Sequence, residues 1–420
     1  PEPTAQPEPP SAAGGAAAPA SPAPAFARQP GHYGDHHPRR LVDPEQVLAS
    51  YPWRLSPETL REVVDRPEDL LAVRDRLTDK LEYAERDAVR ARLMSLRAVV
   101  SRVLGDLDFA LADGRAALAH AEATGELRRT AIVRARLAHV LRWRGEFAEA
   151  DRLFEEANSV ELPDRLRAEM YELAGRSAFD QGRHLEALER FERALLLRRG
   201  DDDQMVSRIE LALDSIMQRV RKSGWGPYPR PLDEIMQRPA ETVSWPPDGY
   251  AQARPFSDGL AWVSRDAEGG WFAVDERNRV IVPGGFDDVG PFRNGVAPVR
   301  RGAGWGAIDR YGRMVVQPKY RRFVTALAGG RPVDGFTAEG LAVVDAGDRV
   351  GVVDRGGQLL VAPVHAALVI HPVAFLIADR AGRWGALDRD GDPLIEVRHR
   401  SEADVIAEID RLLSDTRPVL

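Results

Sequence analysis

Apolar residues recur with the period of an α-helix from Pro44 to about Ser223, a stretch that holds few prolines. This spacing predicts a series of amphipathic helices. After Tyr250 the period shortens to alternate positions, and short apolar runs are separated by clusters of Gly, Asn and Asp. That pattern predicts β-strands joined by tight turns. We therefore expect a multidomain α + β protein, with a helical half followed by an all-β half.

The helical half repeats. Three segments align on one glycine, at Gly105, Gly145 and Gly182. Alanines follow five and twelve positions later in each segment, and Gly114, Phe154 and Phe191 stand nine positions later. Glycine allows a tight turn, and alanines let a second helix lie close against the first. The pattern predicts three helical hairpins, with helices at about 58–84 and 203–222 covering the ends of the stack.

The third copy resembles the tetratricopeptide repeat. Its matching positions are Tyr171, Gly175, Gly182, Ala187, Phe191 and Ala194. The resemblance covers roughly residues 88–200, and the first two copies depart from the pattern at Met94, Gly114, Arg134 and Ala138. It implies an α-solenoid in which the first helix of each pair lines a concave, peptide-binding face.

Positions three and six before each glycine would then lie on that face. They hold Arg102 and Val99, Arg142 and His139, and Phe179 and Arg176. Guanidinium groups bind carboxylates with two parallel hydrogen bonds. We therefore expect Arg102, His139, Arg142 and Arg176 to form a groove for an acidic peptide or an exposed C-terminus. Alternatively, these arginines pair with nearby glutamates of the same protein.

The β half also repeats, around a five-residue phrase at 271–275, 305–309, 350–354 and 384–388. Trp271, Trp305 and Trp384 begin three copies, and Val350 begins the other. Asp275, Asp309, Asp354 and Asp388 end the copies, and Gly or Asn stands three positions after each aspartate. That combination is typical of type I turns, so each unit is predicted to contain a hairpin.

A second phrase carries paired aromatic residues before each hairpin. The pairs are Tyr250 and Phe256, Phe286 and Phe292, and Tyr320 and Phe336, the last separated by an inserted loop at about 323–333. His365 and His371 stand in the same positions of the fourth unit. We interpret them as aromatic positions of a divergent repeat rather than as ligands or an acid–base pair.

These units, over about 250–398, resemble the WG repeat of bacterial proteins. Only Trp305-Gly306 and Trp384-Gly385 are complete Trp-Gly pairs. The resemblance implies repeated β structure, either a small propeller or an open array of hairpins, with no chemistry of its own. We interpret Trp305 as filling the gap between units. The alternative is that Trp271, Trp305 and Trp384 stack on a sugar or a peptide.

Composition sets the remaining boundaries. The expected order is a disordered Pro/Ala-rich tail at 1–40, a helical domain at 41–223, a strap at 224–249, the β domain at 250–398, and a C-terminal helix and tail at 399–420. Trp225, Tyr228 and Trp245 are expected to pack the strap against its neighbours. His32, His36 and His37 of the tail are taken as incidental.

Several function classes are disfavoured. The sequence has no cysteine, which removes disulfides, thiolate nucleophiles and cysteine-bound zinc. A net charge of −7 argues against nucleic-acid binding. We find no apolar run of about 20 residues, no secretory signal, and no dinucleotide, phosphate-loop, HExxH or GxSxG motif. With the bacterial resemblance, a cytoplasmic location is expected.

The sequence favours a non-enzymatic adaptor or scaffold without a cofactor or metal. It would bind a partner protein or acidic peptide in the helical groove and use the WG repeats as a second surface. One alternative is a sensor or carbohydrate-binding module that uses the WG face. Another is an enzyme with a site at the domain junction. The sequence indicates no oligomeric state.

Overall fold

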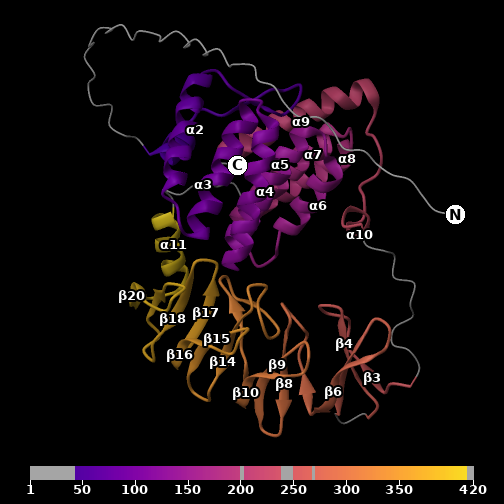
Figure 1. Ribbon diagram of the computed structural model, residues 1–420, viewed down its shortest axis with the longest axis vertical. Helices are drawn as coiled ribbons and strands as arrows, with labels where there is room; N and C mark the ends of the chain where they lie inside the picture. The colour runs from indigo at the N-terminus through magenta and orange to yellow at the C-terminus, as the bar shows by residue number, and fades with distance from the viewer. Residues whose placement is uncertain (1–42, 199–202, 238–248, 267–269, 414–420) are drawn as a thin grey trace, which may run out of the picture. The chain divides into compact units, whose positions relative to one another are not determined.

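The computed structural model describes residues 43–198, 203–237, 249–266 and 270–413. Helices α1 to α10 come first, strands β3 to β20 follow, and α11 is the last described element (Figure 1). This confirms the predicted order of helical repeats and then β repeats. The predicted tail at 1–40 and Trp245 lie outside the described residues. None of the described helices is both long enough and apolar enough to cross a membrane.

Three helical hairpins and a further helix form the helical array. The hairpins are α3 (Asp87–Val103) with α4 (Leu107–Thr124), α5 (Leu127–Arg144) with α6 (Phe147–Ala157), and α7 (Asp164–Asp180) with α8 (His184–Arg198), and α9 (Asp203–Ser223) follows. Gly105, Gly145 and Gly182 end the first helices with φ of +87°, +82° and +70°, a region that glycine enters without strain. The repeat alanines are fully buried, so the paired helices approach closely.

The predicted helix at 58–84 is wrong over its first nine residues. The backbone forms α1 (Pro44–Ser50), a two-stranded hairpin of β1 (Arg54–Leu55) and β2 (Glu62–Val63), and only then α2 (Pro67–Glu82). Pro67 is tolerated in the first turn of α2, but it disfavours helical backbone at the residue before it. We call residues 54–65 the inner-face hairpin.

The β half consists of four sheets in sequence order, and the four strands that each repeat unit contributes pair antiparallel. They contain β3 (Gln252–Ala253), β4 (Leu260–Ser264), β5 (Trp271–Asp275) and β6 (Val280–Phe286); β7 (Asp288–Val289), β8 (Val296–Arg301), β9 (Gly304–Asp309) and β10 (Met314–Tyr320); β11 (Arg322–Phe323), β14 (Leu341–Asp345), β15 (Val350–Asp354) and β16 (Leu359–His365); and β17 (Ala367–His371), β18 (Ala374–Ala378), β19 (Trp384–Leu387) and β20 (Pro393–His399). Among the described residues no sheet closes on itself.

The insertion predicted as a loop at 323–333 contains two short strands. These are β12 (Ala326–Leu327) and β13 (Arg331–Pro332), and β12 pairs in parallel with β17. The insertion therefore extends the fourth sheet and links it to the third unit.

The described part of the strap, residues 224–237, is attached to the helices by an arginine, and its two aromatic rings are exposed. Trp225 and Tyr228 are 39% and 85% exposed, so the predicted packing of these two rings is wrong. Arg230 instead forms ion pairs with Asp151 on α6, at 2.8 Å, and with Glu186 on α8, at 2.9 Å. The short helix α10 (Leu232–Ile235) follows.

The closing helix α11 (Glu402–Leu413) packs on the fourth sheet. Ser401 and Asp404 cap its start by reciprocal hydrogen bonds between side-chain oxygens and backbone N–H groups. Val405 and Ile409 are buried in an apolar cluster with β-strand residues such as Ile395.

Candidate functional site

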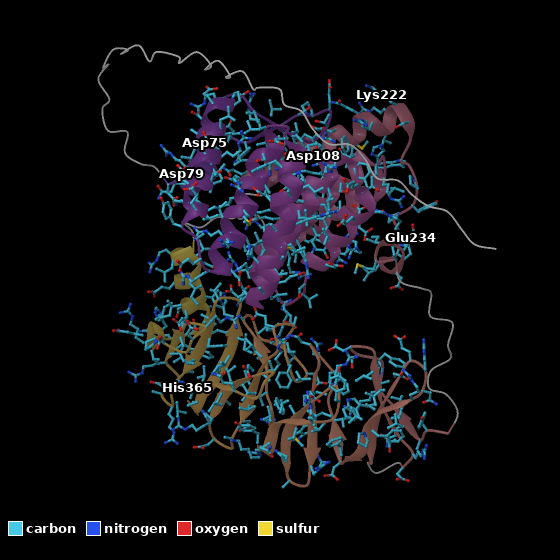
Figure 2. The ribbon with its side chains drawn as sticks, viewed as in Figure 1. Asp75, Asp79, Asp108, Lys222, Glu234 and His365 are labelled. Atoms are coloured by element: carbon cyan, nitrogen blue, oxygen red, sulfur yellow. The ribbon has the colours of Figure 1, made fainter. Side chains whose placement is uncertain are left out.

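The inner face of the helical array gathers the four cationic positions expected from the sequence. Arg102 lies at the end of α3, His139 and Arg142 lie on α5, and Arg176 lies on α7. Their exposed fractions are 1%, 2%, 0% and 4%, so all four are buried. By contrast, Asp75 and Asp79 on α2 are exposed and lie at the outer edge of the helices (Figure 2).

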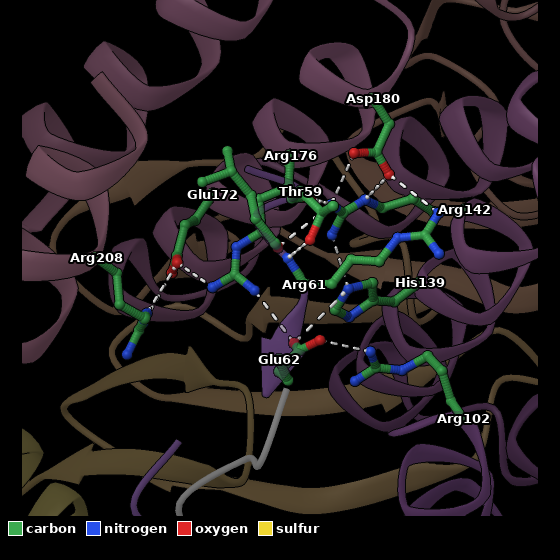
Figure 3. A network of polar contacts seen from close by, with 11 residues as sticks. Thr59, Arg61, Glu62, Arg102, His139, Arg142, Glu172, Arg176, Asp180 and Arg208 are labelled. Atoms are coloured by element: carbon green, nitrogen blue, oxygen red, sulfur yellow. Dashed lines mark hydrogen bonds and ion pairs between the residues drawn. The ribbon is translucent and has the colours of Figure 1, made fainter. Parts of the chain in front are cut away.

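Glu62 of the inner-face hairpin fills the centre of this cluster. Arg102 Nη1 donates to Glu62 Oε2 at 2.7 Å, and Arg176 Nη1 donates to Glu62 Oε1 at 3.2 Å. His139 Nε2 lies 3.8 Å from Oε1 (Figure 3). We call Arg102, His139 and Arg176 the carboxylate seat. Three successive first helices contribute to it, so the seat depends on how the repeats stack.

Arg142 binds a second carboxylate beside the seat. Its Nε donates to Asp180 Oδ2 at 2.9 Å, and its Nη2 donates to Asp180 Oδ1 at 3.2 Å, which is the two-pronged geometry of a strong pair. Arg142 Nη2 also donates to the carbonyl oxygens of Thr59 and Leu60, at 3.1 and 3.3 Å. Arg142 therefore binds the hairpin backbone as well as its own array.

A third carboxylate, Glu172 on α7, continues the network toward α9. Arg208 donates to its two oxygens at 2.8 and 2.7 Å, and Arg176 forms a short contact with one of them. Burial alone would raise the pKa of Glu172, but Arg176 and Arg208 lower it to about 2. Glu172 is therefore ionised at neutral pH and fixes Arg176 for its contact with Glu62.

The charge states of the seat follow from its burial. Burial would raise the pKa of Glu62, but the guanidinium groups of Arg102 and Arg176 hold it well below its ordinary value. Burial, and then Arg102, push the pKa of His139 well below 6.5, so the imidazole is neutral. Arg142 Nη1 lies 3.1 Å from His139 Nε2, which a neutral ring offers as an acceptor. The seat thus binds a carboxylate with two guanidinium groups.

An apolar contact accompanies the carboxylate. Leu60 is fully buried, in a cluster with Phe179, Phe191 and Ile216 of α7, α8 and α9. Its backbone has φ of +50°, a conformation that costs a leucine energy. The hairpin thus presents an aliphatic residue and, two positions later, a glutamate to the inner face.

Sequence reasoning missed Glu62 and Leu60 because it placed both in a helix. Two local signals pointed away from helix: Pro57 and Pro67 bracket the segment, and Val63 and Val64 are β-branched. Neither signal says which distant residues Glu62 meets.

In the β half the repeat aspartates close turns. Asp275, Asp309, Asp354 and Asp388 each accept, at one carboxylate oxygen, backbone N–H groups from the residues two and four positions later. The fourth turn residues are Asn278, Gly312, Gly357 and Gly391, with φ between +59° and +91°. These aspartates hold backbone, so they are not free carboxylates for chemistry.

The repeat tryptophans are not equivalent. Trp271 is 6% exposed and packs in an apolar core, whereas Trp305 and Trp384 are only half-buried. The interpretation of Trp305 as filling a gap between units is therefore too strong. The glycine of the Trp-Gly pair has a clear steric role. A Cβ at Gly306 would lie 2.3 Å from the carbonyl oxygen of Val316, where the pairing of β9 with β10 is irregular.

His371 is buried at the end of β17. Its Nδ1 accepts from the backbone N–H of Val373 at 3.4 Å. Burial, with Arg389 and Arg128, lowers its pKa to about 4. His365 is half-buried at the end of β16. The described residues contain no cluster of three or more His, Cys, Asp or Glu that could hold a metal ion.

A cavity of about 640 Å³ lies between helical and β residues. Its lining includes Arg128 and Arg136 of α5 and Phe375 and Arg389 of the fourth unit. Glu339 spans this junction, because it accepts the Leu127 backbone N–H at 2.9 Å and an Arg389 N–H at 2.8 Å. The cavity is large enough for a small molecule.

Comparison with known proteins gives one family match. The model of the WG containing repeat matches residues 271–303, which hold β5 to β8. The match thus joins the second half of the first sheet to the first half of the second sheet. No curated protein matches the sequence. The match indicates a repeat-based interaction or binding module and specifies no partner.

Proposed function

We propose that this protein is a non-enzymatic adaptor whose inner helical face binds an acidic segment of a partner protein. The helical hairpins would be tetratricopeptide-like, and the WG repeats would form a second interaction surface. The location proposed is the bacterial cytoplasm. The proposal is supported chiefly by Glu62, a carboxylate bound by side chains from the first helices of the first and third hairpins.

The seat suits a peptide carboxylate better than a catalytic role. Arg176 of the seat is fixed by Glu172, and Arg142 beside the seat is fixed by Asp180. The imidazole of the seat is neutral and accepts from Arg142. A positioned donor pair without a nucleophile or a titrating acid recognises a carboxylate but has no means to transform it. Burial makes such a pair selective, since an unpaired guanidinium there is costly.

Each of two alternative functions is supported by one observation. The partial exposure of Trp305 and Trp384 leaves ring surface on which a sugar could stack. The cavity lined by Arg128 and Arg136 offers room for a small anion at the junction. Neither brings together an acid, a base and a nucleophile, so both are ranked below the adaptor.

The adaptor is tested on a variant whose seat lacks its own carboxylate. A labelled peptide with the sequence of residues 55–66 is titrated into the Glu62→Gln protein, alongside the same peptide with glutamine at the Glu62 position. The glutamate peptide is expected to bind at least about tenfold more tightly. Its affinity should fall as salt rises from about 50 to about 300 mM. Equal affinity for both peptides would remove the inner face as a binding site.

A further inference from the structure

We infer that the inner-face hairpin is a displaceable internal ligand. A partner segment with an aliphatic residue two positions before a glutamate competes with Leu60 and Glu62 for the inner face. This inference rests on the adaptor function proposed above and adds to it a partner motif and a mode of regulation. Four observations carry it.

The first observation is how the hairpin is attached. Its hydrogen bonds to the helices, as far as the described residues show, all use an arginine side chain as donor: Arg102, Arg142, Arg176 and Arg219. Within the part of the chain that the structure describes, no backbone ladder joins it to the array, in contrast to a strand within a sheet. Another peptide of the same pattern can accept the same hydrogen bonds from these arginines.

The second observation concerns the chain segments before and after the hairpin. They are anchored by contacts that do not involve the inner face. Leu48 of α1 and Leu70 and Leu77 of α2 belong to an apolar cluster with Leu96 and Val100 of α3. The base of the hairpin is held by the exposed pair of Arg54 and Asp65. Val64 packs on the same cluster, so residues 56–63 can leave the face while α1 and α2 stay in place.

The third observation is strain within the segment. Leu60 holds φ of +50°, which for an aliphatic residue is favourable only when its surroundings enforce it. The apolar neighbours of its buried isobutyl group and the hydrogen bond from Arg142 to its carbonyl oxygen supply that enforcement. A partner that reaches the same contacts without left-handed backbone gains an advantage over the hairpin.

The fourth observation is charge. Four guanidinium groups of the helices, of Arg102, Arg142, Arg176 and Arg208, meet three carboxylates, of Glu62, Glu172 and Asp180. Arg61 of the hairpin lies 3.7 Å from Asp180 and leaves together with Glu62 when the hairpin is displaced. If Glu62 leaves, four cations face two buried carboxylates, which is strongly unfavourable unless another anion enters. The exchange therefore requires a carboxylate in the incoming segment, and an apolar peptide without one cannot displace the hairpin.

The experiment follows the hairpin in the intact protein. Because the sequence has no cysteine, Glu58→Cys creates a single labelling site on the exposed side of the hairpin. Its fluorescence anisotropy is recorded while the 55–66 peptide is added to the otherwise wild-type protein. Peptides with Leu60→Ala or Glu62→Gln serve as probes of the motif. Asp65→Asn, in the protein, is the matched control, since it converts a carboxylate of the same hairpin to an amide at the surface.

Displacement predicts that anisotropy falls saturably with the wild-type peptide and not with either altered peptide. It also predicts that the intact protein and the Asp65→Asn variant bind the peptide at least about tenfold more weakly than the Glu62→Gln variant, since their seat is occupied. If the Glu62→Gln variant does not fold, Leu60→Ala in the protein replaces it, because it keeps the charges and removes the apolar anchor.

Three outcomes overturn the inference. Peptide that binds the intact and Glu62→Gln proteins equally, with the label unmoved, leaves the adaptor function standing but removes the competition. Peptide that binds only the altered protein, and never moves the label in the intact one, makes the hairpin a fixed part of the fold. Absence of glutamate-dependent binding to the folded variants removes the adaptor function as well.

Discussion

Arg102 and Glu62 stand forty positions apart in the sequence and meet at 2.7 Å in a site where both side chains are almost fully buried. The pair connects a segment that precedes the repeats to the first repeat itself. Because Arg176 binds the same carboxylate from α7, the one glutamate also connects the first repeat to the third.

Loss of this carboxylate should destabilise the protein. Glu62→Gln leaves Arg102 and Arg176 buried without their anion, and removal of one partner of a buried pair typically costs about 3–5 kcal/mol. The free energy of unfolding, measured by urea denaturation, should fall by about 3 kcal/mol. Asp65→Asn removes an exposed carboxylate whose ion pair is screened by solvent, so it should change the free energy of unfolding far less. Similar losses for the two variants would contradict the buried network.

His139 should make the free energy of unfolding decrease at acidic pH. Its pKa in the folded protein lies well below the ordinary 6.5, so below pH 6.5 the unfolded state binds a proton that the folded state does not. Stability is therefore lost as pH falls below about 6.5, by up to about 1.4 kcal/mol per pH unit from this group. Urea denaturation at pH 7.5, 6.5 and 5.5 should show a shallower pH dependence for His139→Gln than for the wild type. Parallel curves would show that His139 does not contribute.

Glu169 on α7 should make the free energy of unfolding depend on pH in the opposite direction. Burial raises its pKa to about 7, so between pH 4.5 and 7 the folded state holds a proton that the unfolded state releases. Stability from this group falls as pH rises through that window. Glu169→Gln should stabilise the protein by about 1–2 kcal/mol at pH 8, a value reduced because the side chain is partly exposed. At pH 4.5 the variant and the wild type should unfold at similar urea concentrations.

The Trp-Gly glycine should be intolerant of a single methyl group. Gly306→Ala places a Cβ 2.3 Å from the Val316 carbonyl oxygen, and this backbone atom has less freedom to move aside than the end of a flexible side group. We expect a loss of about 1–3 kcal/mol in thermal or urea unfolding. Gly356→Ala is the control, because its nearest neighbour would be the Asp354 carboxylate at 3.4 Å. If Gly306→Ala were as mild as the control, the close approach would be wrong.

The first repeat shows how the same constraint is met without that glycine. Phe272 stands where the other units have Gly306, Gly351 and Gly385. On the facing strand Gly284 lies opposite, and a Cβ there would sit 3.5 Å from the Cβ of Phe272. In the first copy the glycine thus stands on β6, where an added Cβ would make an ordinary contact, and not on the strand that begins with the repeat tryptophan.

Local features were predictable from the sequence where one residue decides the backbone. Gly105, Gly145 and Gly182 mark helix ends because a left-handed turn needs glycine, and Asp309 marks a turn because its carboxylate caps nearby N–H groups. The role of Glu62 was not predictable in this way. Its partner Arg176 is 114 positions away, and only the stacking of the repeats determines that they meet.

The family match crosses a sheet boundary, since β5 and β6 belong to one sheet and β7 and β8 to the next. Duplication of such a segment inserts two half-sheets, each of which completes a neighbour instead of standing alone. An array of this kind can lengthen during evolution without passing through an unpaired intermediate in its middle. Half-sheets are left only at the two ends of the array. There β3 with β4 complete the first sheet, β19 with β20 complete the last sheet, and α11 covers the last sheet. Gain or loss of repeats in the middle of the array should therefore be tolerated. The terminal units should be under selection to complete and cover the last strands.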